Sequence, residues 1–125
     1  MFSQSPSTVV FHPEETLTRE ELHSLQLRRM QSILNRLSRS PFYRTRISPQ
    51  LTLSSLDHIQ DLPLTTKDDL RAGYPYGFLT EPISSMVRLH ASSGTTGSPT
   101  AILYTEEDVN TWADLVARCM YMVGM

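Results

Sequence analysis

The chain has 125 residues, of which 39% are apolar and 19% are charged, and these values are ordinary for a small globular domain. Its net charge of −2 excludes a general electrostatic attraction to nucleic acid or to an anionic membrane surface. Cys119 is the single cysteine, which excludes an internal disulfide.

Residues 1–16 are predicted to form an irregular N-terminal arm, because Pro6 and Pro13 interrupt regular structure. The arm has neither the basic start nor the apolar run of a signal peptide. No stretch of the chain approaches the length of a membrane span. Together with the single cysteine, these features predict a cytoplasmic protein.

A long amphipathic helix is predicted after the arm. Thr18 and Glu21 have the T-x-x-E spacing of a capping box, and Pro41 ends the helix because it disfavours helical backbone at Ser40. Four apolar residues recur at intervals of three, four and three on one face, which is predicted to pack against the protein: Leu27, Met30, Leu34 and Leu37.

Two shorter helical segments follow. Ser55 is suited to cap a short turn. Thr66 is suited to cap a helix that has acidic residues in its first turn, and Gly73 and Pro75 are predicted to end this helix. The next turn carries three alternating aromatic residues, which are expected to pack rather than to form a ligand platform: Tyr74, Tyr76 and Phe78.

Residues 86–91 and 100–104 are predicted to be strands, and Thr105 is predicted to cap a final helix with three acidic residues in its first turn. One wide face of this helix is apolar, and it comprises Val109, Trp112, Leu115, Val116, Cys119, Met120 and Val123. Cys119 is expected to be a buried structural thiol. The face is too wide for a two-stranded sheet to cover, so the isolated chain is expected to self-associate.

The sequence "HASSGTTGSPT" connects the two predicted strands. Gly94 and Gly97 allow close approach of the backbone to a ligand, and consecutive backbone amides in such a loop can bind an anion. Hydroxyl groups suited to phosphate oxygens surround the glycines, on Ser92, Ser93, Thr95 and Thr96. The spacing matches neither a Walker A loop nor a G-x-S-x-G elbow. From its chemistry alone, the loop is either an ordinary turn or a phosphate cradle.

The histidines give no sign of a metal site, because they are scattered without the spacing of ligands. His90 enters the loop and is expected to be a packed structural residue. A role as general base is the alternative, but no partner carboxylate lies nearby in the sequence.

The order of residues in "SSGTTGSPT" is similar to the first nucleotide-binding signature of the adenylate-forming superfamily, which includes the acyl-CoA synthetases. Further blocks resemble the amino-terminal part of the phenylacetate-CoA ligases in the same order: "SPFYRTRI", "LPLTTKDDLRAGYPYGF", "VRLHASSGTTGSPT" and "YTEEDVNTWADLVAR". The resemblance runs from about Leu17 to the end of the chain.

The resemblance implies an α/β fold in which residues 17–125 form the N-terminal part of the large domain of an adenylate-forming enzyme. The expected order is a helical half, two strands around the Ser/Thr/Gly loop, and a C-terminal helix. It implies use of ATP, Mg²⁺ and coenzyme A to convert an aryl acid to its CoA thioester. It assigns the ATP phosphates to six residues: Ser92, Ser93, Gly94, Thr95, Thr96 and Gly97. Ser98 stands where family members usually have a lysine.

The resemblance further implies that the acid pocket, the catalytic lysine and the acidic residue associated with magnesium lie beyond Met125, so the chain alone is expected to be inactive. Two alternatives stay open. The chain could serve an adenylating relative with a different acid, or it could be a non-catalytic module that binds a partner through its last helix.

Overall fold

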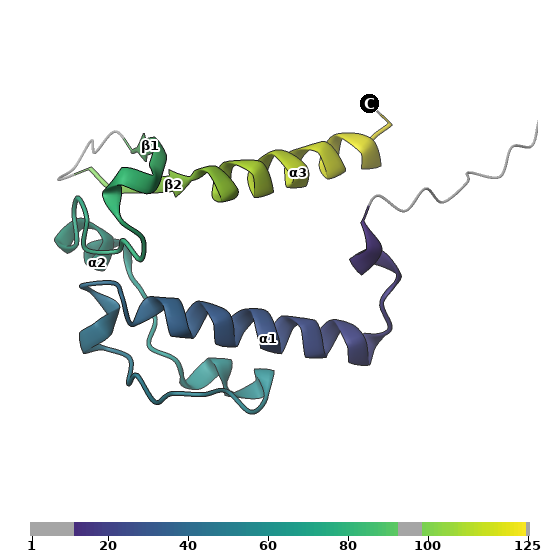
Figure 1. Ribbon diagram of the computed structural model, residues 1–125, viewed down its shortest axis with the longest axis horizontal. Helices are drawn as coiled ribbons and strands as arrows, with labels where there is room; N and C mark the ends of the chain where they lie inside the picture. The colour runs from purple at the N-terminus through teal and green to yellow at the C-terminus, as the bar shows by residue number, and fades with distance from the viewer. Residues whose placement is uncertain (1–11, 93–98, 125) are drawn as a thin grey trace, which may run out of the picture.

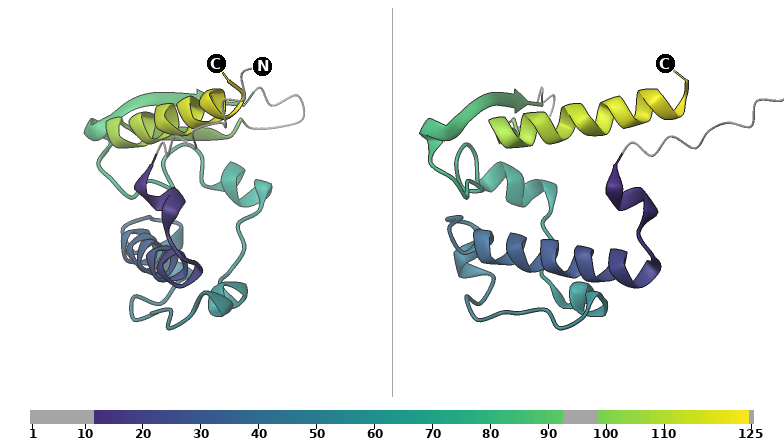
Figure 2. Two further views of the ribbon diagram at one scale, coloured as in Figure 1. Left: turned by 90° about the vertical axis from the view of Figure 1, so that its right-hand side faces the viewer. Right: turned by 45° about the vertical axis from the view of Figure 1, so that its right-hand side comes forward.

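The structure is a computed structural model that describes residues 12–92 and 99–124. It contains three α-helices and one two-stranded sheet within these ranges: α1 (Arg19–Leu37), α2 (Lys67–Ala72), β1 (Met86–Ala91), β2 (Ala101–Thr105) and α3 (Glu106–Met122). Figures 1 and 2 show α1 and α3 running along opposite sides of the molecule, joined at one end by the segment that carries α2. The predicted order, a helical half followed by two strands and a helix, is confirmed.

Helix α1 begins at the predicted capping box. The Thr18 side chain accepts a hydrogen bond from the Glu21 amide at 3.3 Å, and the Glu21 carboxylate accepts one from the Thr18 amide at 2.8 Å. The helix ends at Leu37, shortly before Pro41, as predicted. These reciprocal bonds satisfy amide groups that would otherwise lack a partner in the first turn.

The hydrophobic core lies against α1. Leu34, Ile47 and Leu53 are buried at its centre, and apolar side chains from both α1 and the following segment surround them: Leu27, Met30, Leu37, Tyr43, Leu51 and Leu62. All four residues of the predicted stripe therefore take part. This core is small, and it stabilises the α1 half of the molecule rather than the hairpin.

The end of α1 is tied to the turn that follows α2. Ser40 is fully buried and its hydroxyl donates to the Gly77 carbonyl at 2.9 Å, to which the Phe42 amide also donates at 2.9 Å. A Cβ atom at Gly77 would lie 2.7 Å from the Gly73 carbonyl oxygen, so this close approach requires glycine.

The aromatic residues of this turn divide between packing and exposure. Phe78 packs on Phe42 and Tyr43, with ring centroids 4.3 and 5.7 Å apart, as expected. Tyr74 and Tyr76 are 48% and 49% exposed, so the expectation of packing is wrong for them. The sequence alternation did not reveal that the close approach of Gly77 to Gly73 folds this segment as a tight turn, in which Phe78 packs on Phe42 and Tyr43.

Helix α3 follows β2 directly and rests on the hairpin near its N-terminal end. Thr105 and Asp108 form a capping box, as Thr66 and Asp69 do at the start of α2. Further along, an ion pair at 2.8 Å joins Arg118 to Glu15 in the N-terminal turn Pro13–Thr16. Most of the predicted apolar face stays exposed: Trp112, Leu115, Val116, Met120 and Val123.

Cys119 is exposed, so the expected burial of its thiol is wrong. A free cysteine is buried only where another surface covers its face of the helix. The hairpin covers α3 at Trp112, and Cys119 lies about 10 Å further along the helix axis.

The cap of α2 makes stability sensitive to acid. Hydrogen bonds from the Thr66 amide and hydroxyl, and then from Arg46, lower the pKa of Asp69 from 3.8 to about 2. The unfolded chain therefore binds a proton at this residue more readily than the folded chain does. The stability contributed by Asp69 is complete above pH 4 and is lost as the pH falls toward 2.

We expect Asp69→Asn to lower the free energy of unfolding at pH 7 and to reduce its loss between pH 4 and pH 2, as measured by denaturant unfolding at each pH. Asp68→Asn is the matched control, because Asp68 lies in the same turn but bonds Arg71 rather than the cap. An unchanged acid dependence in Asp69→Asn would contradict this assignment.

Candidate phosphate-binding loop

A β-hairpin holds the two ends of the candidate loop. Strands β1 and β2 pair antiparallel from Met86 opposite Thr105 to Ala91 opposite Ala101, with an irregularity between Met86 and Arg88. Both predicted strands are thus confirmed, the second shifted by one residue from residues 100–104. The hairpin explains why the Ser/Thr/Gly segment begins and ends at adjacent positions in space.

Ser92 and Thr100 extend the pairing beyond the last strand residues. The Ser92 amide donates to the Thr100 carbonyl at 3.0 Å, and the two hydroxyl oxygens lie 2.7 Å apart. The Thr100 amide also donates to the Ser92 hydroxyl oxygen at 3.3 Å. Three hydrogen bonds therefore close the base of the loop.

Of the six predicted phosphate-binding residues, only Ser92 lies within the described part of the chain. The other five, Ser93, Gly94, Thr95, Thr96 and Gly97, lie outside the described residues, as does Ser98. Sequence reasoning missed Thr100 as part of this site. The available signal was a second hydroxyl residue flanking the loop on the side opposite Ser92.

A cluster of rings lies next to the base of the loop. His90 makes edge contacts with Tyr104 and Trp112, at centroid distances of 5.2 and 5.4 Å, and Tyr104 stacks on Trp112 at 6.2 Å. The Arg88 guanidinium lies 5.9 Å from the centroid of the Trp112 ring. His90 thus makes ring contacts, as a packed residue would, but it is exposed at the surface rather than buried. This ring cluster joins α3 to the hairpin.

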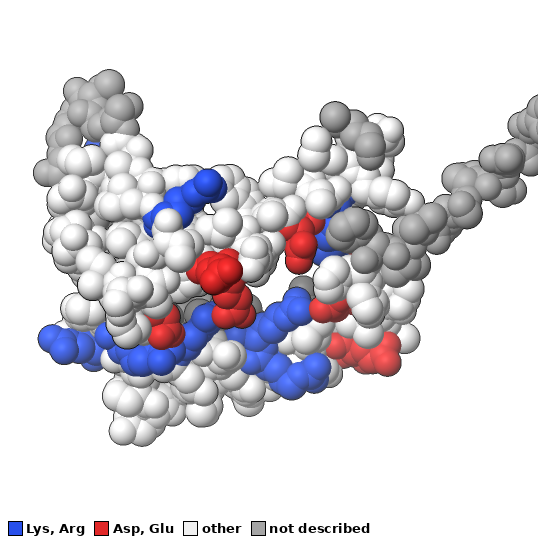
Figure 3. Space-filling model, turned by 45° about the horizontal axis from the view of Figure 1, so that its top comes forward, with Lys and Arg blue, Asp and Glu red and all other residues white. Residues whose placement is uncertain are grey.

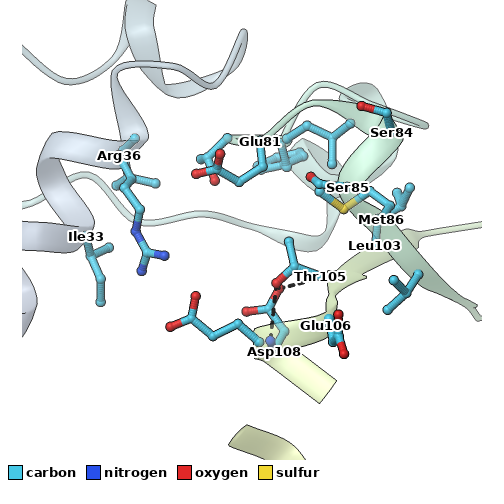
Figure 4. Close-up of a pocket in the computed structure, with 16 residues that line it drawn as sticks. Ile33, Arg36, Glu81, Ser84, Ser85, Met86, Leu103, Thr105, Glu106 and Asp108 are labelled. Carbon is cyan, nitrogen blue, oxygen red and sulfur yellow. Dashed lines mark hydrogen bonds between the residues drawn. The ribbon is translucent and has the colours of Figure 1, made fainter. Parts of the chain in front are cut away.

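A cavity of about 710 Å³ lies between α1, the segment 78–87, the β2 residues Leu103 and Thr105, and the start of α3. Figure 4 shows Arg36 on the α1 side and Glu81, Glu106 and Asp108 on the other walls. On the face drawn in Figure 3, acidic side chains likewise gather beside a band of basic ones. The carboxylates around the cavity disfavour the binding of an anion there.

Within residues 12–92 and 99–124, no three or more His, Cys, Asp or Glu side chains gather as candidate metal ligands. In the same ranges, no helix combines the length and the hydropathy that crossing a bilayer requires.

The chain is similar to curated ligases over most of its length, although no protein-family model matches it. It is 42% identical over 118 residues to a phenylacetate-coenzyme A ligase of Pseudomonas putida, a match that covers 90% of this chain and 27% of the relative. It is 38% identical over 126 residues to the enzyme of that name from Aromatoleum evansii, covering 97% of this chain and 29% of the relative. The chain thus spans somewhat more than a quarter of the length of these relatives.

A solved structure supports the same relationship. The crystal structure of 2-hydroxyisobutyryl-CoA ligase, in complex with 2-HIB-AMP and CoA, matches with a TM-score of 0.77 and 28% identity. The match covers 95% of this chain and 28% of the other.

The fold is that of an N-terminal portion of an adenylate-forming ligase. Within that class, the sequence is similar to phenylacetate-CoA ligases, and the resemblance stated from its motifs is confirmed.

We expect Thr96→Ala to lower kcat/KM for ATP more than His90→Ala in a ligase that contains this chain. Loss of a hydroxyl bonded to a charged phosphate costs about 10- to 100-fold, whereas His90 packs beside the loop base. Steady-state rates at varied ATP make the comparison, with Thr96→Ser as the control that keeps the hydroxyl. A larger loss from His90→Ala would overturn this order and favour a catalytic base.

Proposed function

We propose that this chain forms the ATP phosphate-binding part of an ATP-dependent aryl-acid CoA ligase of the phenylacetate-CoA ligase type. Such an enzyme joins the acid to AMP, releases pyrophosphate, and then transfers the acyl group to the thiol of coenzyme A. The observation that carries the proposal is the 42% identity to a phenylacetate-coenzyme A ligase over 90% of the chain. We place the enzyme in the cytoplasm, in the catabolism of phenylacetate.

In this proposal, the residues that receive the ATP phosphates are Ser92, Ser93, Gly94, Thr95, Thr96 and Gly97. Backbone amides and hydroxyl groups supply the hydrogen bonds, and the two glycines let the backbone approach the phosphate oxygens. Ser98 brings no positive charge where relatives usually carry lysine, so the amides and hydroxyls bear the whole interaction. The hairpin supports this role because it brings both ends of the loop together.

The described residues do not fit a magnesium site, since they contain no cluster of suitable ligands. We therefore assign no Mg²⁺ ligand within residues 12–92 and 99–124. The contribution of this chain is to bind and orient the phosphates, which is the part of catalysis that depends on positioning.

Two other functions compete with this one. An adenylating enzyme for a different acid is favoured by the similarity to 2-hydroxyisobutyryl-CoA ligase. A non-catalytic module that binds a partner through α3 is favoured by the exposed apolar face of that helix.

Exchange of labelled pyrophosphate into ATP tests the function in a ligase that contains this chain. We expect exchange that depends on added acid, with phenylacetate preferred over aliphatic and hydroxy acids, and CoA thioester formation with the same preference. The 125-residue chain alone serves as the control and is expected to form no thioester. Exchange with a preferred hydroxy acid would favour the first alternative, and no exchange with any acid would favour the second.

We also propose that the isolated 125-residue chain self-associates through the apolar face of α3. Leu115 is 51% exposed and lies on this face, whereas Ala117 lies on the opposite side of the helix. Burying one leucine contributes about 1.5–3 kcal/mol, so Leu115→Glu is expected to weaken association about tenfold or more.

Sedimentation velocity over a range of concentrations measures this association. Ala117→Glu is the matched control, because it adds the same charge to the same helix away from the face. Wild-type chain that stays monomeric at all concentrations would refute the proposal.

A further inference from the structure

The base of the loop is closed by side chains as well as by backbone. Beyond the last strand pair, Ala91 and Ala101, one backbone hydrogen bond joins Ser92 to Thr100. The side chains add two more bonds. The two hydroxyl oxygens lie 2.7 Å apart, and the Ser92 hydroxyl oxygen accepts a hydrogen bond from the Thr100 amide at 3.3 Å. Valine at position 100 would keep the branched shape and the backbone bond but would lose the hydroxyl bond.

This hydroxyl pair lies close in the chain to the ring cluster that joins the hairpin to α3. Thr100 leads into β2, whose Tyr104 stacks on Trp112 of α3, and Ser92 follows His90, which contacts both rings. The two strands are therefore held against α3 on the side of the ring cluster. A bond that joins Ser92 to Thr100 transmits this fixed spacing to the two ends of the loop.

Fixing the ends of a loop raises affinity for what the loop binds. Each loop conformation excluded before binding is an entropy loss that binding no longer has to overcome. For a cradle made of consecutive backbone amides, the amides converge on one anion only when the loop ends are correctly spaced.

We propose that Thr100 is a positioning residue for ATP, acting through its hydroxyl bond to Ser92 rather than by contact with the nucleotide. The proposal rests on the proposed function of the loop. It predicts that loss of the Thr100 hydroxyl weakens ATP binding, leaves the chemical step almost unchanged, and leaves the interaction with the acid unaffected.

The test measures KM for ATP, KM for phenylacetate and kcat in a ligase that contains this chain. We expect Thr100→Val to raise KM for ATP about three- to tenfold, the loss of one ordinary hydrogen bond, with kcat and KM for the acid within about twofold of wild type. Thr100→Ser restores the hydroxyl and is expected to return KM for ATP to the wild-type value. Thr45→Val is the matched control, since the Thr45 hydroxyl bonds the Phe42 carbonyl in the segment between α1 and α2, outside the hairpin.

The kinetics of these variants can overturn the proposal. Thr100→Val with the same KM for ATP as Thr45→Val removes the role of the hydroxyl. If KM for ATP is as high in Thr100→Ser, which keeps the hydroxyl, as in Thr100→Val, the effect belongs to packing or backbone at position 100 rather than to the hydroxyl bond. In both cases, exchange of pyrophosphate into ATP by the wild-type enzyme would show that the proposed function itself stands. A wild-type enzyme without any exchange would refute the proposed function and the role of Thr100 together.

A double-mutant cycle with Ser92→Ala separates positioning from general damage to the fold. If the two hydroxyls act as a pair, adding Thr100→Val to Ser92→Ala raises KM for ATP by much less than Thr100→Val does alone. Fully additive effects would show that the hydroxyls act independently and would also overturn the proposal. Thermal unfolding of each variant confirms that the compared proteins are folded.

Discussion

The carbonyl group of Gly77 connects the two halves of this molecule. It accepts hydrogen bonds from the fully buried Ser40 hydroxyl and from the Phe42 amide, both just after α1. Phe78 then packs on Phe42 beside it. Because a buried hydroxyl without a partner is costly, this junction fixes where the chain leaves the α1 core and heads toward the hairpin. The position of the loop depends on it.

The buried core lies in one half of the molecule, around α1. The buried apolar side chains gather around α1, whereas the hairpin and α3 are joined mainly by the ring cluster of His90, Tyr104 and Trp112. The hairpin half therefore has little core of its own, and its apolar residues, such as Val87 and Leu89, remain more than half exposed. The hydrogen bonds between Ser92 and Thr100 are therefore the local polar contacts that join the two ends of the loop.

The charge around the cavity between α1 and α3 differs from the charge near the loop. Carboxylates of Glu81, Glu106 and Asp108 line that cavity, and Arg36 faces them. These carboxylates disfavour phosphate in the cavity, while Arg88, whose guanidinium lies 5.9 Å from the centroid of the Trp112 ring, precedes the loop on β1. This distribution of charge supports the proposal that the loop, rather than the cavity, meets the nucleotide.

The sequence by itself determined the local elements. A threonine begins each α-helix: Thr18, Thr66 and Thr105. Its side chain accepts a hydrogen bond from the amide three residues on, and the acidic side chain of that residue accepts one from the threonine amide. The order of residues in the loop also pointed to the adenylate-forming class before any geometry was available.

Only the tertiary structure decided which predicted faces are covered. Leu34 is buried and Cys119 is exposed, although both lie on apolar helical stripes, because another segment folds over α1 whereas no described segment covers α3 at Cys119. Likewise, Tyr76 and Phe78 alternate in sequence, but Phe78 packs on Phe42 and Tyr43 whereas Tyr76 is about half exposed. The partnership of Ser92 with Thr100 also required the fold, since a hydrogen bond depends on distance in space, which strand register sets.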